Sequence, residues 1–105
     1  MVKFNSAQEF LAELEKDKEK VERKIVRLVY VWVPSKLSPN IQHLSVVATA
    51  RVEGLVYRLD KYCGDVWQID GQDEPVKKKA EETSKLLSEG CAALGLEVRS
   101  GLFEP

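Results

Sequence analysis

The sequence has few of the residues that build catalytic and metal sites. It contains one histidine, His43, and two cysteines, Cys63 and Cys91, which lie far apart in the chain. A zinc site takes its ligands mainly from these two residue types, and a Ser–His–Asp site needs a serine held beside the histidine. We therefore predict no metal and no cofactor, and an enzyme is left open without being favoured. The cysteines are interpreted as free thiols without an assigned role.

The chain also lacks the apolar runs that membranes and export require. No run approaches the ~20 residues of a membrane span, and the opening residues MVKFNSAQEF lack the apolar stretch of a signal peptide. Sixteen basic residues nearly balance 17 acidic ones, so the net charge of −1 gives no general attraction to nucleic acid or to an anionic membrane. These features predict a cytoplasmic protein with no membrane partner.

Two segments of the chain have the apolar spacing of amphipathic helices. SAQE at 6–9 has the pattern of a capping box, and apolar residues recur at helical spacing over 7–21. A second helix is predicted from a cap at Asp73 to a stop at Gly95. Its apolar stripe consists of Val76, Ala80, Thr83, Leu87, Cys91 and Leu94.

An alternating pattern between these helices predicts a β-hairpin. Residues 24–33 form a first strand before Pro34, and residues 44–62 alternate in polarity on both sides of Gly54, which permits a tight reversal. With Glu53 and Gly54 as the turn, the facing pairs match in character: Val52 with Leu55, Ala50 with Tyr57, and Ala48 with Leu59. One long bent strand is the alternative, and the pairing favours the hairpin.

The remaining segments complete a predicted α+β fold in a single domain over residues 1–105. YCGD at 62–65 has the composition of a second turn, VWQI at 66–69 that of a short fourth strand, and LEVRS at 96–100 that of a fifth. The predicted order is α-β-β-β-β-α-β. We expect a mainly antiparallel four- to five-stranded sheet with both helices packed on one face.

Two helices with one apolar stripe each leave the second face of this sheet uncovered. The strands place Arg27, Val29, Val31, Val47, Thr49, Arg51, Val56, Arg58, Asp60 and Tyr62 on that face. Arginine and tyrosine are enriched in protein interfaces, lysine is depleted, and this face has no lysine. We therefore predict a non-catalytic interaction or assembly module that forms a homodimer, or binds another protein, through this face. The predicted interface residues are Arg27, Val29, Val31, Thr49, Arg51, Arg58 and Tyr62.

VKKKAEETSK at 76–85 suggests an alternative function. An order of helix, three strands and a second helix that opens on lysines resembles a double-stranded-RNA-binding domain, and Lys77, Lys78 and Lys79 resemble the lysine cluster with which that family grips phosphates. The preceding residues 72–75 are acidic where that family has a small basic loop. The resemblance implies nucleic-acid binding through these lysines, together with the exposed arginines.

Two further hypotheses concern the aromatic residues. A small-ligand binding protein or an enzyme could place a pocket near Trp32, His43 and Trp67. An RNA-binding sheet of the base-stacking kind needs two or three aromatic residues on its open face. The predicted strands place only Tyr62 there, so base stacking is not favoured.

Overall fold

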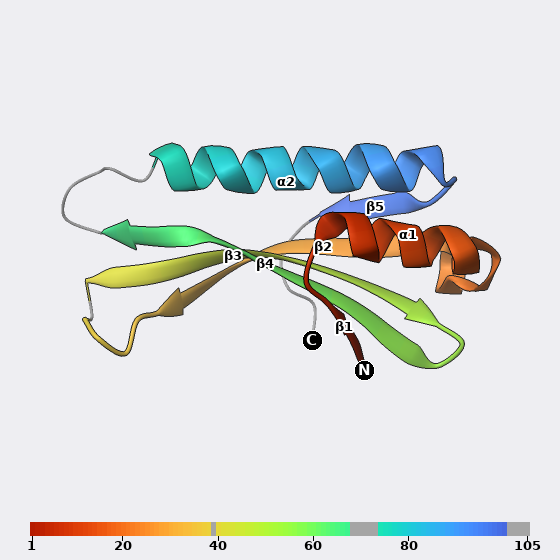
Figure 1. The fold of residues 1–105 in the computed structure, drawn as a ribbon, viewed down its shortest axis with the longest axis horizontal. Coiled ribbons are helices and arrows are strands. Elements are labelled where there is room, and N and C mark those ends of the chain that lie inside the picture. Colours follow the sequence, from red (N-terminus) through yellow and green to blue (C-terminus); the bar gives the residue numbers. More distant parts are fainter. Residues whose placement is uncertain (39, 68–73, 101–105) are drawn as a thin grey trace.

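The computed structural model describes residues 1–38, 40–67 and 74–100, which form a five-stranded sheet and two α-helices. In chain order the elements are β1 (Val2–Phe4), α1 (Ala7–Asp17), the 3-10 turns η1 (Lys18–Lys20) and η2 (Glu22–Lys24), β2 (Ile25–Pro34), β3 (Ile41–Val52), β4 (Leu55–Trp67), α2 (Glu74–Ala93) and β5 (Glu97–Ser100). The antiparallel strands β2, β3 and β4 form the centre of the sheet. β1 pairs in parallel with β4 and β5 with β2, which gives the order β1-β4-β3-β2-β5 (Figure 1). The predicted α+β class is confirmed, and the sheet is mixed rather than purely antiparallel.

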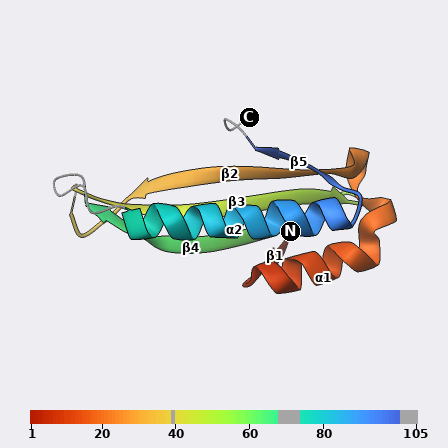
Figure 2. The ribbon, with the colours of Figure 1, turned by 90° about the horizontal axis from the view of Figure 1, so that it is seen from above.

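Both helices lie on one face of the sheet. Figures 1 and 2 show α2 running lengthwise over the central strands, with α1 beside it. The predicted stripe of α2 supplies its buried residues, which are Ala80, Thr83, Leu87 and Cys91. Within the described residues, no helix covers the opposite face of the sheet.

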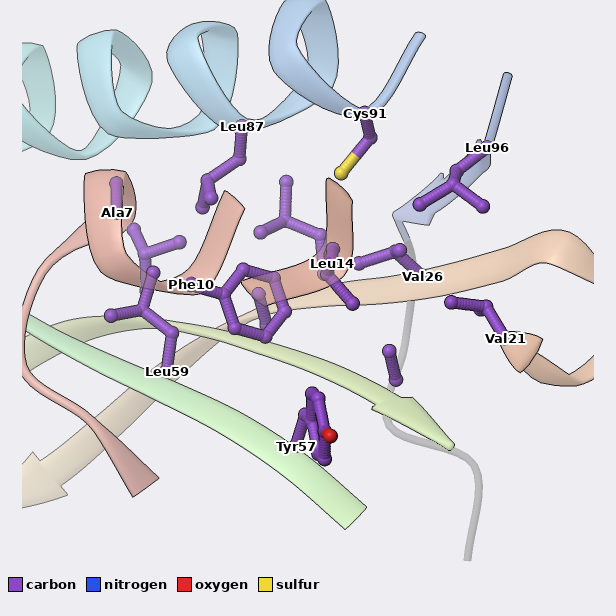
Figure 3. Close-up of a cluster of buried hydrophobic side chains, with 14 of the residues drawn as sticks. Ala7, Phe10, Leu14, Val21, Val26, Tyr57, Leu59, Leu87, Cys91 and Leu96 are labelled. Atoms are coloured by element: carbon purple, nitrogen blue, oxygen red, sulfur yellow. The ribbon is translucent and has the colours of Figure 1, made fainter. Parts of the chain in front are cut away.

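The core lies between this helical layer and the sheet. Phe10 and Leu14 of α1 are fully buried in one cluster with Leu59 of β4 and Leu87 of α2 (Figure 3). Burial of a side chain of this size stabilises the fold by ~1.5–3 kcal/mol relative to leaving it in water. The helix stripes therefore account for which face of the sheet is covered.

Hydrogen bonds secure both ends of α1. The Ser6 hydroxyl accepts from the Glu9 backbone N–H at 3.1 Å, as the capping pattern predicts. At the other end, the Tyr57 hydroxyl donates to Asp17 at 3.0 Å, and this bond to a carboxylate raises the pKa of Tyr57. The helix is thereby tied to β4 at its last turn.

The predicted hairpin is confirmed in its register. β3 and β4 pair Ala48 with Leu59, Ala50 with Tyr57 and Val52 with Leu55. Glu53 (φ +49°) and Gly54 (φ +82°) form the turn. Two consecutive positive φ angles are typical of a type I′ turn, which matches the twist of the strands.

The predicted turn at residues 62–65 is wrong, because β4 continues to Trp67. The pairing with β3 shifts at this point: Ser45 pairs with Tyr62, but Leu44 pairs with Gly64, so Cys63 is the extra residue of a β-bulge. An extra residue inverts the period-two alternation, and in the sequence this inversion resembles a turn. Residues 66–67 of the predicted fourth strand belong to β4. Residues 68–69 and the predicted cap at Asp73 lie outside the described residues.

The beginning of the chain also differs from the prediction. β1 was not predicted, because three residues carry too little pattern; Phe4 holds this strand against the core, with its ring centroid 5.6 Å from those of both Phe10 and Tyr57. α1 ends at Asp17 rather than near Val21, which is nevertheless buried because it forms an isolated bridge with β3. The observed order is β-α-β-β-β-α-β.

Candidate functional site: the uncovered face of the sheet

The strand register defines which side chains share the uncovered face. Arg27 pairs with Thr49 and Thr49 pairs with Arg58, and alternate residues of each strand lie on the same side. This face therefore includes all seven predicted interface residues: Arg27, Val29, Val31, Thr49, Arg51, Arg58 and Tyr62. Their placement on one face is observed, and their role in an interface stays a prediction.

One half of this face carries most of its positive charge. We call it the arginine half; it consists of Lys3, Ile25, Arg27, Thr49, Arg51, Val56, Arg58, Glu97 and Arg99. Register places Lys3 beside Arg58, Arg58 beside Thr49, Thr49 beside Arg27 and Arg27 beside Arg99, so one row crosses all five strands. Like charges directly opposite each other on neighbouring strands oppose folding. Two such pairs lie in this row, Lys3–Arg58 and Arg27–Arg99.

Arg58 and Arg99 each have a carboxylate neighbour among the described residues. Arg58 donates to Asp60 through Nε at 3.0 Å and Nη2 at 3.2 Å, and Arg99 lies 3.4 Å from Glu97. These pairs are solvent-exposed, so each contributes at most about 1 kcal/mol. Arg51 forms no ion pair with any residue that the structure describes. By composition, the arginine half holds five cationic side chains and one carboxylate, that of Glu97, in a chain whose net charge is −1.

A concavity of about 440 Å³ opens at the end of the arginine half. It is lined by Glu22, Arg23, Ile25, Arg27, Thr49, Ala50, Arg51 and Val56. Arg23 (φ +57°) and Lys24 (φ +58°) of η2 both adopt the left-handed backbone region. This region costs a residue with a side chain ~1–2 kcal/mol, and such strain is found preferentially at functional sites.

The other half of the face is mostly apolar. We call it the valine–aromatic half; it consists of Val29, Val31, Val33, Ile41, His43, Ser45, Val47, Asp60, Tyr62, Asp65 and Trp67. Val47 at its centre is buried by its neighbours, with 4% of its surface exposed. Towards the β2–β3 loop, by contrast, Val33 is 49%, Tyr62 52% and Trp67 49% exposed. Large apolar side chains are thus presented together to solvent at this end.

The bulge in β4 produces this composition. It allows Tyr62, Asp65 and Trp67 to share one face, whereas strict alternation would place residues 62, 64 and 66 together. Gly64 lies under the first turn of α2, where an added Cβ would be 2.9 Å from Val76 Cγ2. Its φ of +137° also disfavours any other residue. The sequence prediction missed Asp65 and Trp67 on this face because it ended the strand at the bulge.

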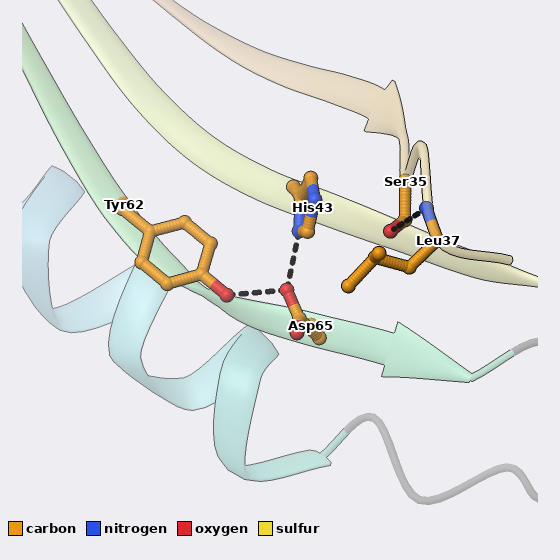
Figure 4. A network of polar contacts seen from close by, with 5 residues as sticks. All are labelled: Ser35, Leu37, His43, Tyr62 and Asp65. Carbon is orange, nitrogen blue, oxygen red and sulfur yellow. Dashed lines mark hydrogen bonds and ion pairs between the residues drawn. The ribbon is translucent and has the colours of Figure 1, made fainter.

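A polar network lies within the valine–aromatic half. Asp65 contacts His43 Nδ1 and accepts a hydrogen bond from the Tyr62 hydroxyl (Figure 4). The bond from Tyr62, followed by the one from His43, lowers the pKa of Asp65, while Asp65 raises the pKa of Tyr62. The concavity that could hold a substrate lies at the opposite end of the sheet, so the network does not form a catalytic pocket with it.

The structure separates two groups of residues that the sequence suggested together. Trp32 pairs with Leu44 on the helix-covered face, whereas His43 and Trp67 lie on the uncovered face, so these three do not line one pocket. Lys77, Lys78 and Lys79 lie in the first turns of α2, next to the contact of Val76 with Gly64. They are thus on the helical layer and at the opposite end of β4 from the arginine half.

The cysteines are buried, and burial raises the pKa of both thiols, that of Cys91 to about 11.

In residues 1–38, 40–67 and 74–100, no three His, Cys, Asp or Glu side chains are grouped so that they could hold a metal ion. Over the same residues, neither helix combines the length and the apolar character needed to cross a membrane.

Comparisons with known proteins give no relative from which a function could be transferred. No family model matches the chain, and searches of curated proteins and of solved structures also find no match.

Proposed function

We propose that this protein is a small cytoplasmic assembly module that forms a homodimer through the valine–aromatic half of its uncovered sheet face. The observation that carries the proposal is the group of half-exposed apolar side chains at the end of this half, Val33, Tyr62 and Trp67. Large exposed apolar side chains gathered on one face are typical of interaction sites in soluble proteins, and tyrosine and tryptophan are among the residues that contribute most at interfaces.

The chemistry of this half suits a second copy of the same chain. In a two-fold interface each patch faces itself, so any charge must find its opposite within the same patch. The valine–aromatic half meets this condition within each copy, because its Asp65 carboxylate already contacts His43 and Tyr62. Its remaining carboxylate, Asp60, is already paired with Arg58. The arginine half could not face itself without repulsion.

The size of this patch predicts a weak dimer. Four residue rows on three strands cover about 27 by 14 Å of the sheet. The flat area of the patch is therefore on the order of 400 Å² per copy, without the additional surface that protruding side chains provide. A standard interface buries ~800 Å² per partner. We therefore expect a dissociation constant on the order of 10–100 µM, as in transient complexes.

Sedimentation equilibrium from about 5 to about 500 µM protein tests the proposal. Val33→Glu places a charge in the patch, and we expect it to weaken association at least ~10-fold, equivalent to about 1.4 kcal/mol. Trp32→Glu is the matched control, because Trp32 is the neighbouring residue of β2, is 43% exposed and lies on the opposite face. Circular dichroism at low concentration checks that both variants fold.

A wild-type protein that stays monomeric at the highest concentration would contradict self-association. Equal effects of Val33→Glu and Trp32→Glu would show that the dimer uses another surface.

A further inference from the structure

We propose that the arginine half of the sheet binds the phosphate backbone of double-stranded nucleic acid, independently of base sequence. This surface is separate from the one proposed for self-association. The first observation is the row Lys3–Arg58–Thr49–Arg27–Arg99, which places a basic side chain on four of the five strands. Two of its cross-strand pairs, Lys3–Arg58 and Arg27–Arg99, join like charges, so the row concentrates positive charge along one line of the sheet.

The dimensions of the row suit a long anion rather than a single phosphate. Five strands at a spacing of ~4.8 Å give a row about 19 Å long. An inorganic phosphate would occupy only part of this length, whereas a nucleic-acid backbone presents charges along all of it. Arg51 lies one row closer to the hairpin turn and adds a cation with no ion pair among the described residues.

The concavity beside this row supplies the second observation. Arg23, Arg27 and Arg51 line it, and Glu22 is its one acidic lining residue. Arg23 is held there on a strained left-handed backbone, and nothing in the packing of η2 requires an arginine, because η2 buries no residue. Arginine is the side chain best suited to phosphate, since its guanidinium can donate two parallel hydrogen bonds.

The absence of aromatic residues from the arginine half indicates a duplex. Proteins that bind single strands stack bases on aromatic rings. Among the residues that the structure describes, the aromatic side chains of this face, Tyr62 and Trp67 with His43, lie in the other half, where Asp60 and Asp65 would repel phosphates. A duplex keeps its bases inside and offers only its backbones to a flat basic surface, so binding through the arginine half would not depend on sequence.

Fluorescence anisotropy with a labelled RNA duplex of about 20 base pairs, its DNA equivalent and the corresponding single strand tests this proposal. If three to four phosphates are neutralised, raising salt from about 50 to about 200 mM should weaken duplex binding by roughly 40- to 150-fold. Val33→Glu should leave the affinity per chain unchanged, since it lies outside the arginine half. Failure of self-association therefore does not bear on this result.

Charge reversal locates the binding surface. We expect Lys3→Glu combined with Arg51→Glu to weaken duplex binding more than ~10-fold and to reduce the salt dependence. Arg51→Lys should retain most of the binding, because the positive charge is kept. Lys78→Glu combined with Lys79→Glu is the matched control: it reverses the same number of charges on α2, and we expect a change of less than about twofold.

Four results would overturn the proposal. The first is no duplex binding at about 100 µM protein and low salt. The second is loss of binding with the α2 variant but not with the arginine-half variant. The third is preferential binding of the single strand with a change in tryptophan fluorescence, which would indicate base stacking at Trp67. Binding of polyglutamate as tight as that of the duplex would likewise assign the surface to an acidic protein.

Discussion

Replacing Gly64 by alanine would test whether the bulge in β4 sets the distance between α2 and the sheet. Two separate costs are expected at this position. The first is backbone strain at φ +137°, of order 1–3 kcal/mol for a residue with a side chain. The second is overlap with Val76, whose Cγ2 would lie 2.9 Å and whose Cγ1 3.5 Å from the new Cβ. Overpacking of this kind costs ~1–3 kcal/mol, and a β-branched valine has few other rotamers to escape into.

Together these costs amount to roughly 2–6 kcal/mol, a large part of the ~5–15 kcal/mol that stabilises a domain of this size. Gly54→Ala is the matched control, because Gly54 also has a positive φ (+82°) but nothing within 4 Å of an added Cβ. It should cost only the strain, ~1–2 kcal/mol. The difference between the two variants contains the overlap with Val76 together with the difference in strain between φ +137° and φ +82°, and the Val76→Ala background separates the two.

Urea unfolding followed by far-ultraviolet circular dichroism gives the free energies, and Val76→Ala completes a double-mutant cycle. In the Val76→Ala background both methyl groups that meet the new Cβ are absent, so Gly64→Ala should cost ~1–3 kcal/mol less than in the wild type. Strictly additive costs, or a Gly64→Ala cost equal to that of Gly54→Ala, would refute the close approach of α2.

Three other properties of the molecule lead to predictions. Glu53→Asn should raise the free energy of unfolding by about 0.5–1 kcal/mol in urea titrations, because asparagine tolerates the positive φ of a type I′ turn better than glutamate does; no gain would contradict the turn geometry. The pKa of Asp65 is lowered in the folded state, so its stabilising effect is present above the usual aspartate range near pH 3.9 and is lost as pH falls below it. Melting temperatures of Asp65→Asn should therefore fall less than those of the wild type between neutral and acid pH, and equal losses would argue against the bond from Tyr62. Cys63 and Cys91 are buried with raised pKa values, so a thiol reagent should label them only after unfolding, and rapid labelling of the native protein would contradict their burial.

The sequence was sufficient for the parts of the fold that depend on regular periodicity. The helix stripes identified the face that is covered, and polarity matching around Glu53 and Gly54 gave the register of the hairpin. The same alternation failed at Cys63, because one extra residue in a bulge reverses the phase, and the reversed pattern has the composition of a turn. Asp65 and Trp67 were consequently not assigned to the uncovered face.

The arginine half could be predicted only in part. Arg27, Arg51 and Arg58 lie in the three long strands, whose alternation assigns them to one face. Lys3 and Arg99 come from the two ends of the chain, and only the order of strands in the sheet brings them beside Arg58 and Arg27. Pairing of such short strands in parallel depends on contacts distant in sequence, which local pattern does not encode.

The helices shield only part of the sheet face on which they lie. Tyr30, Trp32 and Leu55 share that face, yet about half of each side chain is exposed. α2 contacts β3 and β4 more than β2, so it does not cover the outer side of β2. At the edge of the covered area, the Tyr30 hydroxyl accepts a hydrogen bond from the Ser84 hydroxyl at 3.0 Å. Sequence alternation assigns each side chain to a face of the sheet, but the width of the covering helix determines how much of that face is buried.

The short outer strands leave part of the sheet margin without a neighbour. β5 pairs only with Ile25 to Leu28, so within the described residues the backbone of β2 from Val29 onwards has no strand on its outer side. The five residues VYVWV at 29–33 carry no charge and strongly favour extended backbone. Such a margin is a template onto which further chains can add by hydrogen bonding. At high concentration this protein is therefore prone to edge-to-edge polymerisation through β2. Pro34 limits the pairing at the end of the strand, because proline has no backbone N–H to donate to an added chain.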